Sequence, residues 1–240
     1  MVKKWVIFAS LLLASAANAQ TLKLVTEDYP PYGYREAGIY KGASVEQVEL
    51  MMKGAGLEYS IEMMPWARAL ALAETDDLTC VFTTVHNAER DRRFKWVEPL
   101  LVDRTVLIRK TGSGVNPATL AEAAGFVVGT QLGDFTEDLL TAKNFRKIDL
   151  ASDFDLTLKK LLNGRIDLMP ISEKYFDKLK RGGVGVDSVL LLSEEIYSLA
   201  CNDGVADEDI GKMQASLKKL IDDGTQDKLF HKYGLDQRSN

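Results

Sequence analysis

The sequence predicts an α/β protein built as two lobes, each a mostly parallel sheet flanked by helices, that are joined by two crossings of the chain. Strand-like segments alternate with helical ones along most of the 240 residues, as is typical of such sheets. The alternation forms two blocks, near residues 20–108 and 114–190, with the connection "RKTGSGVN" between them. The remaining tail is too short for a third block, so we expect it to return to the first lobe.

Local signals predict each element of the first block in turn. Ser44 is expected to cap a helix, with Gln47 completing a capping box, and Pro65 marks the start of the next helix. The strands are apolar or alternate apolar and polar side chains. The predicted order is strand 22–28, helix from Ser44 to about Gly54, strand 57–64, helix 66–75 and strand 79–84.

The second block repeats this alternation, and the tail follows it. We expect strands at 125–130, 146–151, 166–171 and 188–195, helices at 136–143, 153–164 and 172–181, and then strand 196–203 with helices 207–224 and 225–234. The predicted domains are therefore residues 20–108 with 195–240 as lobe 1, and residues 109–194 as lobe 2.

The first 19 residues predict a signal peptide that is cleaved after Ala19. Lys3 and Lys4 precede an apolar segment that is too short to span a membrane, and "ANA" has the small residues of a cleavage site. An uncleaved membrane anchor is the alternative. We therefore expect a periplasmic protein.

Charge argues against a nucleic-acid partner. Removing Lys3 and Lys4 lowers the formal net charge from −5 to −7, whereas phosphate backbones favour clustered positive charge. Four cationic residues occur within residues 90–95, but Glu89, Asp91 and Glu98 interrupt this run.

Two cysteines, Cys80 and Cys201, follow the signal peptide, and an oxidising compartment favours a disulfide between them. Two buried free thiols are the alternative. The chain has only two histidines, His86 and His231, which does not favour a metal site, and it lacks phosphate-binding and dinucleotide-binding motifs. We therefore expect neither a metal nor a cofactor.

Three motifs in this order resemble solute-binding protein family 3, the periplasmic amino-acid-binding components of ABC transporters. They are "YPPY" after the first strand, "PWARAL" at the start of a helix, and "NAERDRRFKWVEP" after the third strand. The resemblance covers nearly all of the chain after the signal peptide. It implies the type II periplasmic-binding-protein fold, closure of two lobes around a small ligand, and a membrane permease as partner. We expect a monomer.

The resemblance also implies most of the ligand-binding residues. Arg90 occupies the position of the arginine that grips the ligand's α-carboxylate, for which a guanidinium offers two parallel donors. Tyr29 and Trp66 match aromatic residues on either side of the ligand, and Thr83 and Thr84 end the strand that supplies hydroxyl groups. Ordinary core packing is the alternative for both aromatic residues, and a surface ion pair is the alternative for Arg90.

The second lobe departs from the amino-acid pattern. Ser172 stands where the family has an amine-binding acid, and Asp134 lies where a carboxylate would be bound. Asp134 is expected either to cap its own helix or to hold a cation. Gln131 and Ser172 are expected to supply neutral hydrogen bonds, and Arg68 to point either into the cleft or into solvent.

These observations predict a binding protein, not an enzyme, that captures a small polar or zwitterionic metabolite for an ABC transporter. A sensor module for a kinase or chemoreceptor is one alternative. A dehydratase-like enzyme on the same fold is another, and Glu27, Asp28 and Glu173 are its candidate acid and base residues.

Overall fold

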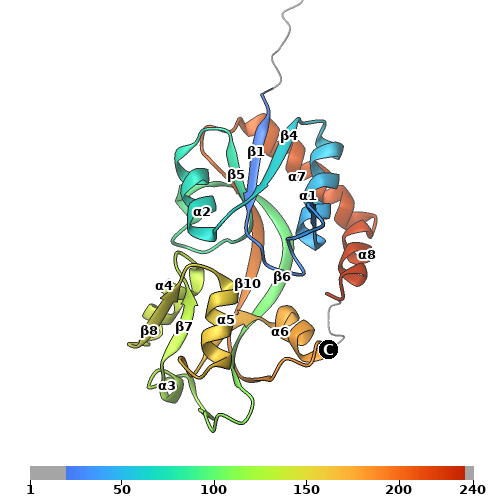
Figure 1. Cartoon of the computed structure of the whole chain (residues 1–240). Helices are drawn as coiled ribbons and strands as arrows, with labels where there is room; N and C mark the ends of the chain where they lie inside the picture. Colours follow the sequence, from blue (N-terminus) through green and yellow to red (C-terminus); the bar gives the residue numbers. More distant parts are fainter. Residues whose placement is uncertain (1–19, 236–240) are drawn as a thin grey trace, which may run out of the picture.

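Two lobes, drawn one above the other in Figure 1, make up the computed structural model, which describes residues 20–235. The predicted signal peptide, residues 1–19, lies outside the described residues. The α/β class and the two-lobed arrangement predicted from the sequence are confirmed.

The upper lobe in Figure 1 contains three parallel strands, with β1 (Leu22–Thr26) between β4 (Tyr59–Met63) and β5 (Thr79–Val85). Helices α1 (Ala43–Ala55) and α2 (Trp66–Thr75) make the connections. Parallel strands need such crossovers, so the chain here follows the predicted strand–helix–strand order.

Helix α1 begins earlier than predicted. Its N-cap is Gly42, and Ser44 lies in the first turn, where its buried hydroxyl has no hydrogen-bond partner within residues 20–235. The capping box predicted for Ser44 and Gln47 is therefore wrong. A Cβ atom at Gly42 would lie 2.3 Å from the carbonyl oxygen of Tyr32, and the φ of 126° also requires glycine. This close approach of two backbone segments determines where the helix starts.

The lower lobe in Figure 1 contains a parallel pair of strands, β7 and β8, and three longer helices. Its elements are α3 (Leu120–Ala123), β7 (Val128–Gln131), α4 (Phe135–Ala142), β8 (Ile148–Ala151), α5 (Phe154–Leu162), β9 (Met169–Ser172) and α6 (Glu173–Arg181).

Two long antiparallel strands, β6 (Lys95–Lys110) and β10 (Val186–Cys201), run through both lobes. They belong to a mixed sheet of order β4-β1-β5-β10-β6-β9. From the sequence we predicted no strand at residues 95–108, and two separate strands in place of β10. Each long strand passes from one core to the other, so its side chains follow no single alternation. The lobe boundaries at residues 108 and 194 fall within these strands and remain proposals.

The C-terminal helices α7 (Asp207–Asp222) and α8 (Thr225–Lys232) pack against α1 in the upper lobe. Met213 and Leu217 of α7 enter the same core as the cysteines. The predicted disulfide is present in the structure and joins Cys80 on β5 to Cys201 on β10, where the two residues face each other.

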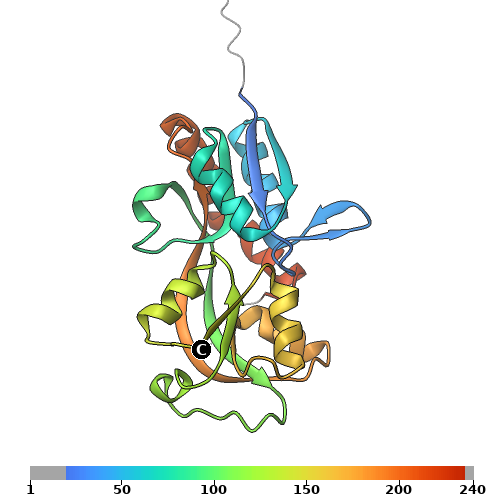
Figure 2. The ribbon, with the colours of Figure 1, turned by 60° about the vertical axis from the view of Figure 1, so that its left-hand side comes forward.

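A short hairpin, in a region for which the sequence predicted neither helix nor strand, projects from the upper lobe in Figure 2. It consists of β2 (Tyr34–Glu36) and β3 (Ile39–Lys41), and both turn residues, Ala37 and Gly38, have positive φ. Within residues 20–235, none of the helices combines the length and apolar character needed to cross a membrane.

Candidate functional site

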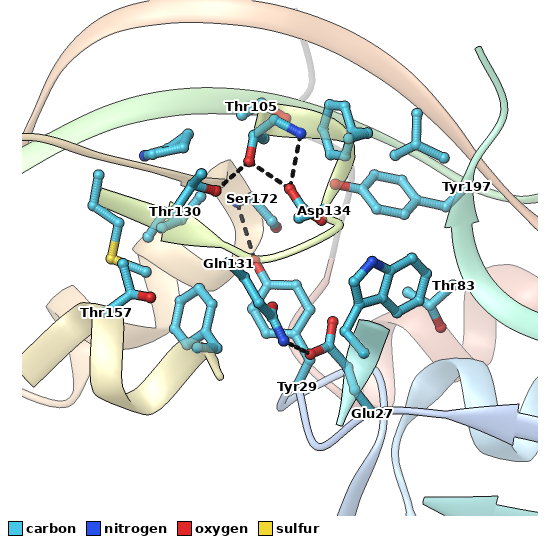
Figure 3. Close-up of a pocket in the computed structure, with 18 of the residues that line it drawn as sticks. Glu27, Tyr29, Thr83, Thr105, Thr130, Gln131, Asp134, Thr157, Ser172 and Tyr197 are labelled. Carbon is cyan, nitrogen blue, oxygen red and sulfur yellow. Dashed lines mark hydrogen bonds between the residues drawn. The ribbon is translucent and has the colours of Figure 1, made fainter. Parts of the chain in front are cut away.

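A small cavity of about 50 Å³ lies between the lobes, and most of the residues predicted to bind a ligand line it (Figure 3). Its polar lining comes from three sources: the upper lobe, the lower lobe and the crossing strands. The upper lobe contributes Glu27, Tyr29, Trp66, Thr83 and Arg90. The lower lobe contributes Thr130, Gln131, Asp134, Thr136, Thr157 and Ser172, and the crossing strands contribute Thr105 and Tyr197. Whether each of them contacts a ligand remains a prediction.

Arg90 is buried, with only 3% of its surface exposed. It precedes a short 3₁₀ turn at Asp91–Arg93, and its Nη2 donates to the carbonyl oxygen of Gly133 across the cleft at 3.0 Å. Nη1 is buried and has no hydrogen-bond partner in the described part of the chain. Burial lowers the pKa of Arg90, but a guanidinium remains charged in proteins. The cavity therefore contains a positive group with an unused donor.

Trp66 and Tyr29 form apolar walls of the cavity. Trp66 starts α2, and its indole nitrogen donates to the same Gly133 carbonyl at 2.8 Å, while the Arg90 guanidinium lies 5.7 Å from its ring centroid. Tyr29 packs against Phe154, with ring centroids 4.7 Å apart, and its hydroxyl accepts a hydrogen bond from the backbone N–H of Ser172 at 3.2 Å. Both aromatic residues thus reach from the upper lobe to the lower one.

The two adjacent threonines at the end of β5 have different surroundings. Thr83 lines the cavity, has a positive φ of 62°, and has a buried hydroxyl that lacks a partner among residues 20–235. Thr84 is fully buried and donates to the Val81 carbonyl at 3.2 Å, so the structure does not bring it to the cavity. Thr83 has no partner on β10, because the pairing of β5 with that strand shifts in register between Phe82 and Thr84. This irregularity, and not the regular alternation of a strand, distinguishes the two threonines.

Arg68 is exposed and does not line the cavity either. It follows Trp66 by two positions in α2, and residues two apart on a helix do not share a face. Because Trp66 points into the cleft, Arg68 points towards solvent, which was one of its two predicted orientations.

Glu27 lines the cavity at the end of β1, although the sequence analysis named it only as an enzyme candidate. Its carboxylate accepts a hydrogen bond from the Gln131 amide at 2.7 Å, across the cleft (Figure 3). Burial raises the pKa of Glu27 to about 8, against the lowering effect of that hydrogen bond. A carboxyl group at a parallel strand's end was the available sequence signal.

Asp134 lies on the opposite side of the cavity from Glu27 in Figure 3. Its side chain caps α4 by accepting from the backbone N–H of Thr136 at 2.9 Å, as the sequence predicted. Burial raises its pKa, although the Thr136 hydrogen bonds and the Arg90 charge act in the other direction. The cavity thus contains one guanidinium and two carboxyl groups.

Ser172 caps α6 and is part of a buried hydrogen-bonded cluster beside the crossing strand β6. Its hydroxyl accepts from the Tyr175 N–H at 3.1 Å, lies 2.5 Å from the Tyr32 hydroxyl, and is hydrogen-bonded to the Asp103 carboxylate. Asp103 lies on β6 behind Ser172 and does not line the cavity. The sequence did not point to Asp103, or to Thr105 and Tyr197 of the cavity wall, because β6 and β10 were not predicted as continuous crossing strands.

Comparison with solved structures supports the fold. A protein from Geobacillus stearothermophilus described as arginine-, lysine- and histidine-binding is similar, with 18% identity, a TM-score of 0.82, and coverage of 91% of this chain and 97% of that one. A histidine kinase sensor domain that resembles periplasmic binding proteins is 16% identical, with a TM-score of 0.81 and coverage of 89% and 96%. An ancestral amino-acid-binding protein, a precursor of cyclohexadienyl dehydratase, is 19% identical, with a TM-score of 0.77 and coverage of 89% and 94%.

At these identities the structural likeness shows the fold alone. No curated protein matches the chain. A family model, however, matches residues 22–236, which is most of the sequence and nearly all of its described part. The resemblance found in the motifs is thereby confirmed, and the chain belongs to the bacterial extracellular solute-binding proteins, family 3.

Proposed function

We propose that this protein captures one small carboxylate-bearing molecule between its lobes and delivers it to the permease of an ABC transporter. The observation that carries the proposal is a set of three unused polar groups in the cavity, the Arg90 Nη1 and the hydroxyls of Thr83 and Thr105. A buried polar group without a partner costs about 1–3 kcal/mol, and a charged one costs more. A bound carboxylate offers hydrogen-bond acceptors to donors of this kind.

The charges of the cavity favour a zwitterion, such as an amino acid or a related metabolite. Arg90 suits an anionic group, whereas Glu27 and Asp134 suit a cationic or hydrogen-bond-donating one. A ligand ammonium beside Glu27 would favour its ionised form and lower its raised pKa. The Geobacillus stearothermophilus neighbour, described as binding arginine, lysine and histidine, supports the same ligand class.

Ligand entry requires the lobes to separate. Trp66 and Arg90 both donate to Gly133, and Gln131 donates to Glu27, so hydrogen bonds cross the cleft beside the cavity. The enclosed volume of about 50 Å³ has room for only a few water molecules. We infer a hinge motion at β6 and β10 that closes the lobes around the ligand.

The test is a thermal-shift screen of the exported form against amino acids, amines, organic acids and oligopeptides, repeated with Arg90→Ala. A ligand that binds only the folded state raises the melting temperature. We expect a carboxylate-bearing compound to do so, and Arg90→Ala to lower its affinity about 100-fold, because charge-assisted bonds contribute roughly 1.5–3 kcal/mol each.

Arg92→Ala is the matched control for this experiment. Arg92 lies two residues away, is exposed, and does not line the cavity, so its removal should leave the ligand-induced shift unchanged. Equal shifts for wild type and Arg90→Ala would contradict the role proposed for Arg90. Shifts produced only by amines without a carboxylate would contradict the ligand class.

We infer binding and not catalysis, because only one of the three candidate acid and base residues lines the cavity. Glu27 lies there, whereas Glu173 forms an ion pair with Arg104 at 2.6 Å and Asp28 is exposed. Incubation of each binder with the protein, followed by mass spectrometry, would reveal any turnover.

We also propose export to the periplasm with cleavage after Ala19, which N-terminal sequencing of the secreted protein tests. Loss of ligand uptake on deletion of the gene would support transport over sensing.

A further inference from the structure

His86 lies immediately after β5, outside the cavity, in a cluster that the proposed function does not use. Its Nδ1 is 2.8 Å from a carboxylate oxygen of Glu98, and its Nε2 is 2.9 Å from a carboxylate oxygen of Asp91. The ring stacks on Trp96 with centroids 4.0 Å apart and an interplanar angle of 9°. The imidazole is thus held on both edges and on one face.

This geometry suits the doubly protonated ring. A neutral imidazole has one N–H and one lone pair, so one of its nitrogens would place a lone pair against a carboxylate oxygen. An imidazolium donates to both carboxylates. Partial burial opposes the positive charge, but the hydrogen bonds to Asp91 and Glu98 outweigh it and raise the pKa of His86.

The other groups around the ring do not reverse the effect of the two carboxylates on His86. Among the described residues, Arg92 and Asn87 line the same surface hollow as His86, and Arg92 is exposed. The hydroxyl of Ser198 on β10 donates to the Glu98 carboxylate at 2.8 Å, which helps to fix that carboxylate. Two carboxylates and one exposed guanidinium therefore surround one histidine.

Asp91 connects this cluster to the ligand site, because it directly follows Arg90. The Asp91 carbonyl accepts from the Trp96 indole at 3.2 Å, while its side chain faces His86. On the other side, the Arg90 N–H donates to the side-chain oxygen of Asn87 at 3.0 Å. The backbone that directs Arg90 into the cavity is thus held at Asn87 and at Asp91.

We propose that His86 is a positioning residue for Arg90: its doubly protonated ring holds Asp91, and with it the turn that aims the Arg90 guanidinium into the cavity, and loss of one proton loosens that turn. The consequence for ligand affinity rests on the function proposed above. The stabilisation of the turn is present below the ordinary histidine pKa of 6.5 and is lost as the pH rises through the higher pKa of the folded protein.

Solution NMR of the ligand-free protein tests this role. With only two histidines in the chain, the ring signals are assigned by His86→Gln and His231→Gln variants. We expect His86 to titrate above 6.5. The hydrogen exchange of the Arg90 side-chain N–H groups, corrected for its intrinsic pH dependence, should rise about tenfold across that midpoint.

The variants separate positioning from general destabilisation. Asp91→Asn should lower the titration midpoint of His86 and raise the hydrogen exchange of the Arg90 side chain already at pH 6. His86→Gln should abolish the pH-dependent rise in Arg90 exchange. His231→Gln should leave the His86 midpoint and the Arg90 exchange unchanged. A His86 titration midpoint at or below 6.5 would overturn the proposal, and so would Arg90 side-chain exchange that does not change across that midpoint. A clear step in a protein that binds no carboxylate would overturn the proposed function but not the positioning role.

Discussion

Replacing both cysteines with alanine is expected to lower the free energy of unfolding by about 5 kcal/mol. The Cys80–Cys201 bond links residues 121 positions apart, and closing so long a loop removes much conformational entropy from the unfolded chain. Both cysteines are buried in the core of the upper lobe, so their removal also costs packing. Urea denaturation in the absence of a reductant, so that the wild-type disulfide stays intact, would measure the difference in stability.

Reduction provides the control for the double variant. A reductant should shift the unfolding midpoint of the wild type towards that of Cys80→Ala with Cys201→Ala, and should leave the double variant unchanged. If the wild type and the double variant unfolded at the same urea concentration, the disulfide would not be a stabilising constraint on this fold.

Substituting Glu27→Gln is expected to stabilise the protein at pH 8 by roughly 2–4 kcal/mol, and to have almost no effect at pH 4. The folded protein keeps a proton on Glu27 up to a pKa of about 8, whereas the unfolded chain releases it near 4.5. The unfolded state therefore binds fewer protons between these values, and stability falls as the pH rises through this window. Glutamine has the same size and can still accept from the Gln131 amide.

Melting curves at several pH values between 4 and 9 would measure this effect. Glu58→Gln is the matched control, because Glu58 is exposed and does not line the cavity. We expect the curves of Glu58→Gln to follow the wild type at every pH. A Glu27→Gln variant whose stability also fell in parallel with the wild type between pH 5 and 8 would contradict the raised pKa.

The sequence predicted the local structure well where the signals are local. The strand–helix alternation of β1 to β5 and of β7 to α6, the cap at Asp134 and the class of fold all follow from periodicity and capping, which depend on neighbouring residues. Arg90, which the family resemblance singled out, lines the cavity, and its contact with a ligand remains a prediction. The strands, helices and cap depend on spacing along the chain, so one sequence suffices for them, whereas Arg90 was singled out only by the family resemblance.

The long strands β6 and β10 could not be predicted at full length from local sequence patterns. Each lies in two cores in succession, so its pattern of burial changes partway along, and neither was predicted at full length. As a consequence, Thr105 and Tyr197 were missed, although both line the cavity. Likewise, an irregularity in the pairing of β5 with β10 accompanies the difference between Thr83, which lines the cavity, and Thr84, which does not.

The sequence by itself determined the two-lobed α/β fold and, through its motifs, the family. Only the tertiary structure decided which charges share the cavity with Arg90, and what partners Ser172 and His86 have. Glu27 meets Gln131 across 104 positions of the chain, and Ser172 meets Tyr32 across 140. Burial and long-range contacts of this kind set the pKa of a side chain and decide whether its hydrogen-bond donors have partners. They form only when the folded chain brings the two lobes together.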